Sequence, residues 1–255
     1  MKEWLVLLLL LARIAGFIGI SPLIFPKQGL SPVVKAFFAL LLAVLMLPVV
    51  GQSPIVDNLA QKFLQLFIKE SFTGMLLGFI TLLFANLYVT AGQFIDLTSG
   101  LGAAVLFNPL SQTNAGILAN FLYLYGMLNF FIADGHHRLL TFLAESYKIL
   151  PLGGGFYSLT TGEVVLKIFS LTMLVALEVA IPFMMVMVIT DLALGILSRT
   201  APQLNVFMLS FALKIFLAIF TLWLLLPGLS YFSGIFLKLA ENNLLQFLRS
   251  ISYGG

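Results

Sequence analysis

Apolar residues run along this chain in long stretches, and short polar or proline-containing breaks separate them. A helix of about 17–25 mainly apolar residues is long enough to cross the hydrocarbon core of a bilayer. Six stretches come close to this length: Trp4–Phe25, Val33–Val50, Ser71–Ile95, Ile117–Ala133, Val164–Thr190 and Val206–Leu226. The pattern predicts an all-α membrane protein with about six long apolar helices.

Two further segments have an amphipathic pattern. The first follows Asp134 and ends at Pro151; its polar side carries Arg138, Thr141, Glu145 and Lys148. The second, about Ile235–Ile251, carries Lys238, Asn242, Gln246 and Arg249. Each is predicted to be a helix with one polar stripe. Such a helix either lies on the membrane surface or docks a partner protein, and the pattern favours neither alternative.

The longest break in the apolar pattern covers residues 92–116, GQFIDLTSGLGAAVLFNPLSQTNAG. This stretch of about 25 residues reads as neither a clear helix nor a clear strand. Loops of that length inside a compact protein are usually functional or disordered. The apolar run from Ala103 to Phe107 argues against disorder. The stretch is therefore predicted to be an ordered, buried loop with a function.

Composition places the chain in a membrane or a very large assembly. Hydrophobic residues make up 61% of it and charged residues only 9%, whereas soluble domains carry about 25% charged residues. The net charge of +3 is spread thinly, so no basic cluster indicates nucleic-acid binding. The absence of cysteine excludes disulfides and thiolate metal sites.

Three charged residues, Arg13, Glu178 and Lys214, stand inside apolar stretches. A charge at the bilayer centre costs about 2.5–3.5 kcal/mol on insertion scales, so such residues almost always face protein or water. The spacing of Thr200 and Gln203 is that of a capping box, which predicts a helix start near residue 201.

A turn at 198–202 would then place Lys214 opposite about Val186, since helical residues rise about 1.5 Å each. Asp191 would lie about 7 Å from the level of Val186, and Glu178 would lie about 12 Å from the same level, on the side away from the turn. The charges are therefore predicted to pair with another segment or another chain, in an obligate assembly. Small residues at Gly74/Gly78, Ala12/Gly16 and Ala15/Gly19 permit close helix contacts, either within one bundle or between subunits of such an assembly.

Both histidines of the chain stand in the run Asp134-Gly135-His136-His137. Adjacent helical residues point about 100° apart, so the two histidines are predicted not to share a metal ion. Asp134 is explained more simply as the N-cap of the following helix. The chain contains no nucleophile–base set, phosphate loop or dinucleotide fingerprint, and the prediction is a protein without enzymatic activity, cofactor or metal.

Several motifs together resemble the FliR family, the flagellar branch of the type III secretion export-gate proteins. They are Ala12-Arg13, Gly92-x-x-Ile95-Asp96, Asn108-Pro109, Asp134-Gly135-His136-His137, Leu150-Pro151-Leu152-Gly153 and Arg199-x-x-Pro202-Gln203-x-Asn205-Val206-Phe207 to Lys214. The similarity runs over nearly the whole chain. Each motif alone is weak, and the combination is specific.

The resemblance implies a subunit of the flagellar protein export gate in the bacterial inner membrane, within the basal body of the flagellum. FliR-like proteins assemble with FliP and FliQ around a central pore, and FlhB wraps its base. Unfolded export substrates pass through this pore. The resemblance also implies a FliP-like part over about 1–160 and a FliQ-like hairpin with a C-terminal amphipathic helix over about 161–255. It places the hairpin loop in the cytoplasm, whereas the distribution of Lys and Arg favours cytoplasmic termini.

Two groups of residues are predicted to carry this function. The first is a loop that is predicted to seal the pore. Glycines keep the loop pliable, and its apolar surface excludes water. The alternative is a re-entrant connection buried between helices. Its residues are Gly100, Gly102, Ala103, Ala104, Val105, Leu106, Phe107, Asn108 and Pro109. The second group docks partners or lies buried: Arg13, Asp96, Glu178, Arg199, Gln203, Asn205, Phe207 and Lys214. The segment from Arg199 to Phe207 is expected to be the docking turn.

Two other classes of function fit parts of the pattern. Broken helices around residues 92–116 would suit a small-solute transporter or channel. A membrane-embedded metalloenzyme would use Asp134, His136 and His137.

Overall fold

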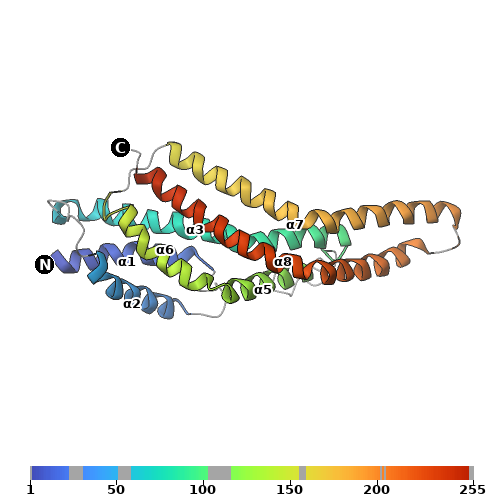
Figure 1. Cartoon of the computed structure of the whole chain (residues 1–255), viewed down its shortest axis with the longest axis horizontal. Coiled ribbons are helices and arrows are strands. Elements are labelled where there is room, and N and C mark those ends of the chain that lie inside the picture. Colours follow the sequence, from blue (N-terminus) through green and yellow to red (C-terminus); the bar gives the residue numbers. More distant parts are fainter. Residues whose placement is uncertain are drawn as a thin grey trace. The chain divides into compact units, whose positions relative to one another are not determined.

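The computed structural model describes residues 2–22, 31–50, 59–102, 116–154, 159–201, 203 and 205–252. The elements in this part of the chain are helices, which confirms the predicted all-α class (Figure 1). They are α1 (Lys2–Ile20), α2 (Pro32–Val50), α3 (Leu59–Ser99), α5 (Ile117–Ile132), α6 (Gly135–Ile149), α7 (Leu159–Thr200) and α8 (Val206–Ser252).

Three of the described helices, α3, α7 and α8, are long and apolar enough to cross a membrane. The pair α5 and α6, interrupted at Ala133–Asp134, would make a fourth span if the two helices count as one broken span. The helices α1 and α2 are shorter apolar helices. Length and composition therefore support three or four spans in the described residues.

Two predicted boundaries are wrong. The helix α3 continues to Ser99, so residues 92–99 are helical and the break begins only after them. Gly92 is a contact point inside this helix, because a Cβ there would overlap the backbone of Ala119 on α5. The helix α8 runs without a break through Pro227 and joins the last apolar stretch to the C-terminal amphipathic segment.

The helix ends show which polar residues act as caps. Pro32 begins α2, and the hydroxyl of Ser31 accepts a hydrogen bond from the amide of Val34 at 3.4 Å, as expected for an N-cap followed by proline. Thr200 ends α7, and its hydroxyl donates back to the carbonyl of Ile196. The predicted helix start near residue 201 is therefore wrong, and Asn205 caps α8 by accepting from the amide of Met208 at 3.4 Å.

The chain divides into two compact units, which are described separately. Unit 1 consists of Met1–Phe84, Phe130–Ser170 and Phe236–Gly255, and unit 2 of Ala85–Asn129 and Leu171–Ile235.

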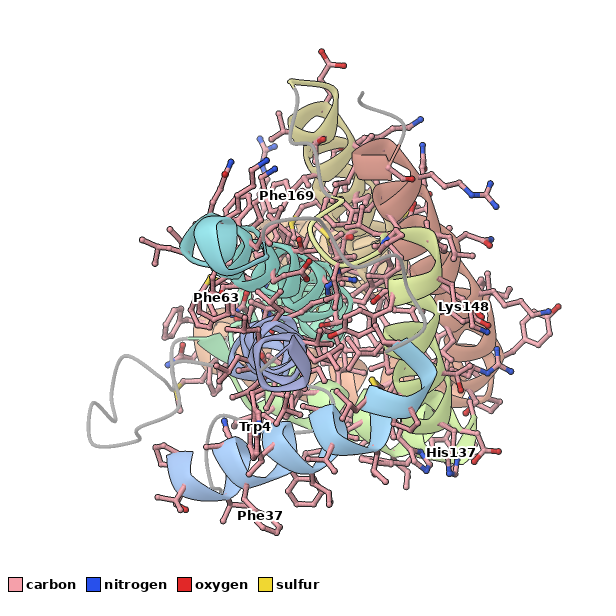
Figure 2. The ribbon with its side chains drawn as sticks, turned by 90° about the vertical axis from the view of Figure 1, so that its left-hand side faces the viewer. Trp4, Phe37, Phe63, His137, Lys148 and Phe169 are labelled. Atoms are coloured by element: carbon pink, nitrogen blue, oxygen red, sulfur yellow. The ribbon has the colours of Figure 1, made fainter. Side chains whose placement is uncertain are left out.

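In unit 1, α1 packs against α2 and lies unusually close to α3. A Cβ added at Gly16 would come within 2.6 Å of the Ser71 carbonyl, and one at Gly78 within 2.8 Å of the Phe17 carbonyl. The predicted close contact at these small residues is thus confirmed within the chain, whereas Gly19 has open space around it. In Figure 2, Phe37 projects from the outer side of α2, where 62% of its surface is exposed.

The amphipathic helix α6 also belongs to unit 1. Its buried side carries Leu139, Phe142, Leu143, Ser146 and Tyr147. The predicted polar stripe is exposed at Arg138, Thr141, Glu145 and Lys148. The predicted division of this helix into two sides is confirmed.

Unit 2 contains the C-terminal part of α7 and the N-terminal part of α8, together with the end of α3 and most of α5. Tyrosines of α3 and α5 bind α8 by hydrogen bonds. The hydroxyl of Tyr88 lies 2.6 Å from that of Ser233, and the hydroxyl of Tyr125 donates to the carbonyl of Leu226 at 2.7 Å. Tyr125 also bonds the hydroxyl of Ser230.

Candidate functional site

Arg13 is the centre of a buried polar cluster in unit 1. Its side chain is fully buried, and its Nε lies 2.6 Å from Oε2 of Glu70 on α3. Its terminal nitrogens donate to the carbonyls of Ser146 at 3.3 Å and Leu150 at 3.1 Å. One guanidinium therefore joins α1 to α3 and to the end of α6. We call Arg13, Glu70, Ser146, Tyr147 and Leu150 the Arg13 cluster.

The remaining polar atoms of the cluster also have partners. The ring of Tyr147 lies 4.2 Å from the guanidinium carbon of Arg13, in cation–π contact. The Tyr147 hydroxyl donates to the carbonyl of Leu10 at 3.2 Å. The second carboxylate oxygen of Glu70 accepts from the amide of Gly153 at 2.8 Å. A buried ion pair is tolerated when its other hydrogen-bonding groups are satisfied in this way, so the cluster holds helices together rather than serving as a reactive site.

Sequence reasoning found Arg13 and missed Glu70. Glu70 lies between Lys69 and Ser71, at the polar edge from which the third apolar stretch was counted. The signal that would have found it is the single buried arginine in the first helix, which requires a buried acid elsewhere.

Asp96 forms a second buried polar site, in unit 2. Its side-chain oxygens accept hydrogen bonds from the amides of Leu118 at 3.1 Å and Ala119 at 2.9 Å, at the start of α5. A negative charge is stabilised there by the free amides and the dipole of the helix N-terminus. A Cβ at Gly116 would overlap the Asp96 carboxylate, so glycine is required for this approach.

Asp96 thus holds the base of the predicted sealing loop. Gly100, the first residue of the predicted loop, has a φ of +80°, which favours glycine. A Cβ at Gly102 would lie 3.4 Å from the Asp96 carbonyl, so the chain before the loop and the chain after it both approach Asp96. The loop residues Ala103, Ala104, Val105, Leu106, Phe107, Asn108 and Pro109 lie outside the described residues.

Lys214 and Asp191 form an ion pair between α8 and α7, with Nζ and Oδ1 2.6 Å apart. The prediction that Lys214 finds no partner within the hairpin is wrong. The cause is the position of the turn: α7 ends at Thr200 and α8 begins at Val206, so the turn is centred about three residues later than assumed. That shift moves the level opposite Lys214 by about six residues, or about 9 Å, to the level of Asp191.

Glu178 has no ion pair with any described residue, and its side chain is exposed on α7. Its neighbours on the exposed surface of the same helix are apolar, for example Leu174 and Ile181. The docking-turn residues Arg199, Gln203, Asn205 and Phe207 are exposed as well, and Phe207 is 80% exposed.

The Asp134 run departs from prediction. Asp134 has a left-handed backbone with a φ of 55°, and its side chain makes no cap hydrogen bond. One potential ligand atom from each of Asp134, His136 and His137 lies within 4.8 Å of the others. The two adjacent imidazoles lie close together, with ring centroids 4.1 Å apart, although a helical wheel separates them by about 100°.

Comparisons with known proteins agree with the resemblance found in the sequence. Residues 4–239 match the family described as Bacterial export proteins, family 1. The chain is 31% identical to the flagellar biosynthetic protein FliR of Aquifex aeolicus (strain VF5) over 228 residues, which cover 89% of this chain and 87% of the relative. It is 30% identical to that of Escherichia coli (strain K12) over 239 residues, covering 91% and 90%.

A third relative, the flagellar biosynthetic protein FliR of Bacillus subtilis (strain 168), is 28% identical over 211 residues, which cover 82% of this chain and 81% of the relative. The match extends from α1 into α8 and thus includes the Arg13 cluster, Asp96 and the Lys214–Asp191 pair. The chain belongs to the FliR family of bacterial export proteins.

Proposed function

We propose that this chain is a subunit of the flagellar type III protein export gate. In this role it forms, with FliP-like and FliQ-like subunits, the pore through which unfolded flagellar substrates cross the inner membrane, and an FlhB-like protein binds the same assembly. The observation that carries the proposal is the family match over residues 4–239. A family of export proteins favours this function over small-solute transport, and the role is structural rather than enzymatic.

The exposed surfaces of the last two long helices support an assembly of several subunits. On α7, Met185, Ile189 and Leu192 are more than half exposed, and on α8 so are Phe216 and Trp223. Lipid is sufficient to cover these apolar side chains, so it is the charge beside them that supports contact with a sister subunit. Glu178 on the same helix is a charge, and a charge is costly against lipid, so we assign it to contact with a basic side chain of a sister subunit.

The proposal places the two ends of the chain in different roles. Residues from about 1 to 160 form a FliP-like part. Residues from about 161 to 255 form a FliQ-like hairpin with a C-terminal amphipathic helix. The shorter apolar helices α1 and α2 pack with the assembly at the level of the membrane. The site of action is the inner membrane within the flagellar basal body.

The loop of residues 100–109 is the part of the chain that we assign to sealing the pore. The support comes from its base, where the Asp96 carboxylate binds the start of α5 at 2.9 and 3.1 Å. A firmly held base with pliable glycines beside it suits a plug that yields to a polypeptide and then returns. Shortening the loop across Gly102–Leu106 should leave the complex assembled and make cells leaky to ions. A deletion that assembles, secretes and stays tight would contradict the plug.

Purification in mild detergent tests the assembly itself. The chain, expressed in its own host and captured through a C-terminal tag, should co-purify with FliP-like and FliQ-like proteins identified by mass spectrometry. The matched variant is Glu178→Gln, which removes the exposed charge and keeps the shape of the side chain. We expect it to reduce the yield of sister subunits without changing the amount of the chain. Recovery of the wild-type chain alone, as a stable monomer, would contradict the proposal.

A further inference from the structure

The run Asp134-Gly135-His136-His137 has no part in the proposed gate function, yet it gathers unusual chemistry at one place. It holds both histidines of a chain that contains no cysteine. It comprises the last residue before α6 and the first three residues of that helix, and all of its residues belong to unit 1. Imidazole nitrogen and carboxylate oxygen are typical ligands of divalent transition metals.

The three side chains converge in space. The Nδ1 of His137 lies 3.5 Å from Oδ1 of Asp134, and the ring centroids of His136 and His137 are 4.1 Å apart. One potential ligand atom from each residue lies within 4.8 Å of the other two. This convergence needs no distortion of the helix, because residues in a first turn have no preceding turn of their own helix against which their side chains would clash.

The backbone around the run is shaped for this convergence. The left-handed conformation of Asp134 begins α6 directly at Gly135. A Cβ at Gly135 would overlap the ring of Phe130, so only glycine permits this close return of the chain. The ring of His136 packs 5.4 Å from that of Phe131, which fixes the position of one imidazole.

The ligand atoms are not fully used by the protein. The Nδ1 of His136 is buried and has no hydrogen-bond partner among the described residues. A buried polar atom without a partner is destabilising. The side chain of Asp134 makes no cap hydrogen bond, and its Oδ1 faces Nδ1 of His137 at 3.5 Å, so one ion could bind both atoms.

We propose that Asp134, His136 and His137 form a binding site for a divalent transition-metal ion of the Zn²⁺ class. Two imidazoles and one carboxylate, with water as the fourth ligand, match the composition of an open zinc site. Mg²⁺ and Ca²⁺ prefer oxygen ligands and fit this set poorly. Ligand atoms about 2.0–2.2 Å from a tetrahedral zinc lie about 3.3–3.6 Å apart. The exposed side chains of Asp134 and His137 reach this spacing by rotation.

The surroundings of the site give an ion access to it and partly balance the ion's positive charge. A half-open cavity of about 200 Å³ adjoins the site and is lined by Asp134, His137, Arg138, Thr141, Phe142, Glu145 and Glu241. The N-terminus of α6 and the charge of Arg138 oppose a cation there. Arg138 is paired with Glu241 at 3.7 Å, and the carboxylates of Asp134 and Glu145 add negative charge.

Zinc binding to the full chain, purified in detergent without a polyhistidine tag, tests the proposal. Competition with a chromophoric chelator gives the stoichiometry and the dissociation constant for Zn²⁺. We expect one Zn²⁺ per chain in the wild type. His137→Ala, at a residue that is 72% exposed, should fold normally and bind at least about tenfold more weakly, because even outer-shell groups typically contribute 10–100-fold to affinity.

Thr141→Ala is the matched control, since Thr141 lines the same cavity and offers no imidazole or carboxylate. It should bind like the wild type. As a second readout, Co²⁺ should give the visible absorption of a tetrahedral nitrogen–oxygen site in the wild type, and the double variant His136→Ala/His137→Ala should lose it. Absence of saturable binding, or equal affinity of the wild type and His137→Ala, would overturn the proposal.

Discussion

Glu70 meets Arg13 at a distance of 2.6 Å, although 57 residues separate them in the sequence. Both side chains are almost completely buried. Because Arg13 also donates to two carbonyls at the end of α6, this pair determines how three separate segments of unit 1 pack together. Its contribution is therefore expected to show in the stability of the folded chain rather than in any chemical step.

Removing one charge of the pair should destabilise the protein strongly. Glu70→Gln leaves the Arg13 guanidinium buried without its counter-charge, which typically costs about 3–5 kcal/mol. We expect a lower melting temperature in detergent and a reduced amount of the chain in membranes. Glu145→Gln, an exposed acid on α6, is the control and should behave like the wild type. An unchanged melting temperature for Glu70→Gln would contradict the structural role of the cluster.

Alanine substitutions at two glycines test whether α1 and α3 are in close contact. A Cβ at Gly74 would overlap the backbone of Arg13, while one at Gly19 meets nothing within 4 Å. Gly74→Ala should therefore cost about 1–3 kcal/mol or more through overpacking. Gly19→Ala should be neutral or stabilise α1 by up to about 1 kcal/mol. Thermal unfolding of the two variants measures this difference, and equal melting temperatures would show that α1 and α3 are not in close contact.

The Lys214–Asp191 ion pair should tolerate the exchange of its two residues better than a change of either one alone. Asp191→Asn should lower the amount of inserted protein, because it leaves Lys214 on an apolar helix without its partner. Lys214→Asp should have a similar effect. Exchanging the two residues, in Asp191→Lys/Lys214→Asp, should restore part of the loss, since the pair is re-formed with reversed polarity. If the exchange is as harmful as the sum of the single changes, the two residues do not interact in the membrane.

The docking turn can be tested without disturbing the start of α8. Asn205 caps that helix through its side-chain oxygen, whereas Gln203 lies in the connection and is exposed. Gln203→Ala should reduce secretion of flagellar proteins about tenfold, which corresponds to about 1.4 kcal/mol of lost hydrogen bonding to a partner. The amount of the chain should not change. Normal secretion with Gln203→Ala would argue against docking.

Much of the fold followed from periodicity. The apolar stretches and the two sides of α6 were readable because each helix buries one kind of residue. The joining of α8 across Pro227 was not, because proline usually ends or kinks a helix. Likewise, residues 92–99 contain Gly92 and Thr98 and resemble a loop, but contact with α5 keeps them helical.

The polar sites show the same division. Arg13 was found because a charge in an apolar stretch is conspicuous, but its partner Glu70 belongs to another helix and had no local signal. The partner of Lys214 was missed through an error of three residues in one turn, since each residue of shift in a hairpin moves the facing position by two. Tertiary pairing of this kind depends on where helices end, and helix ends are the features that a sequence predicts least accurately.

The most direct test of the export-gate function is secretion in the native host. Deleting the gene for this chain should abolish the appearance of flagellar proteins in the medium while their synthesis inside the cell continues. Supplying the wild-type chain in trans should restore secretion and motility. Supplying Glu70→Gln should restore them poorly, in proportion to the amount of folded chain. Normal secretion of flagellar proteins by the deletion strain would contradict the account.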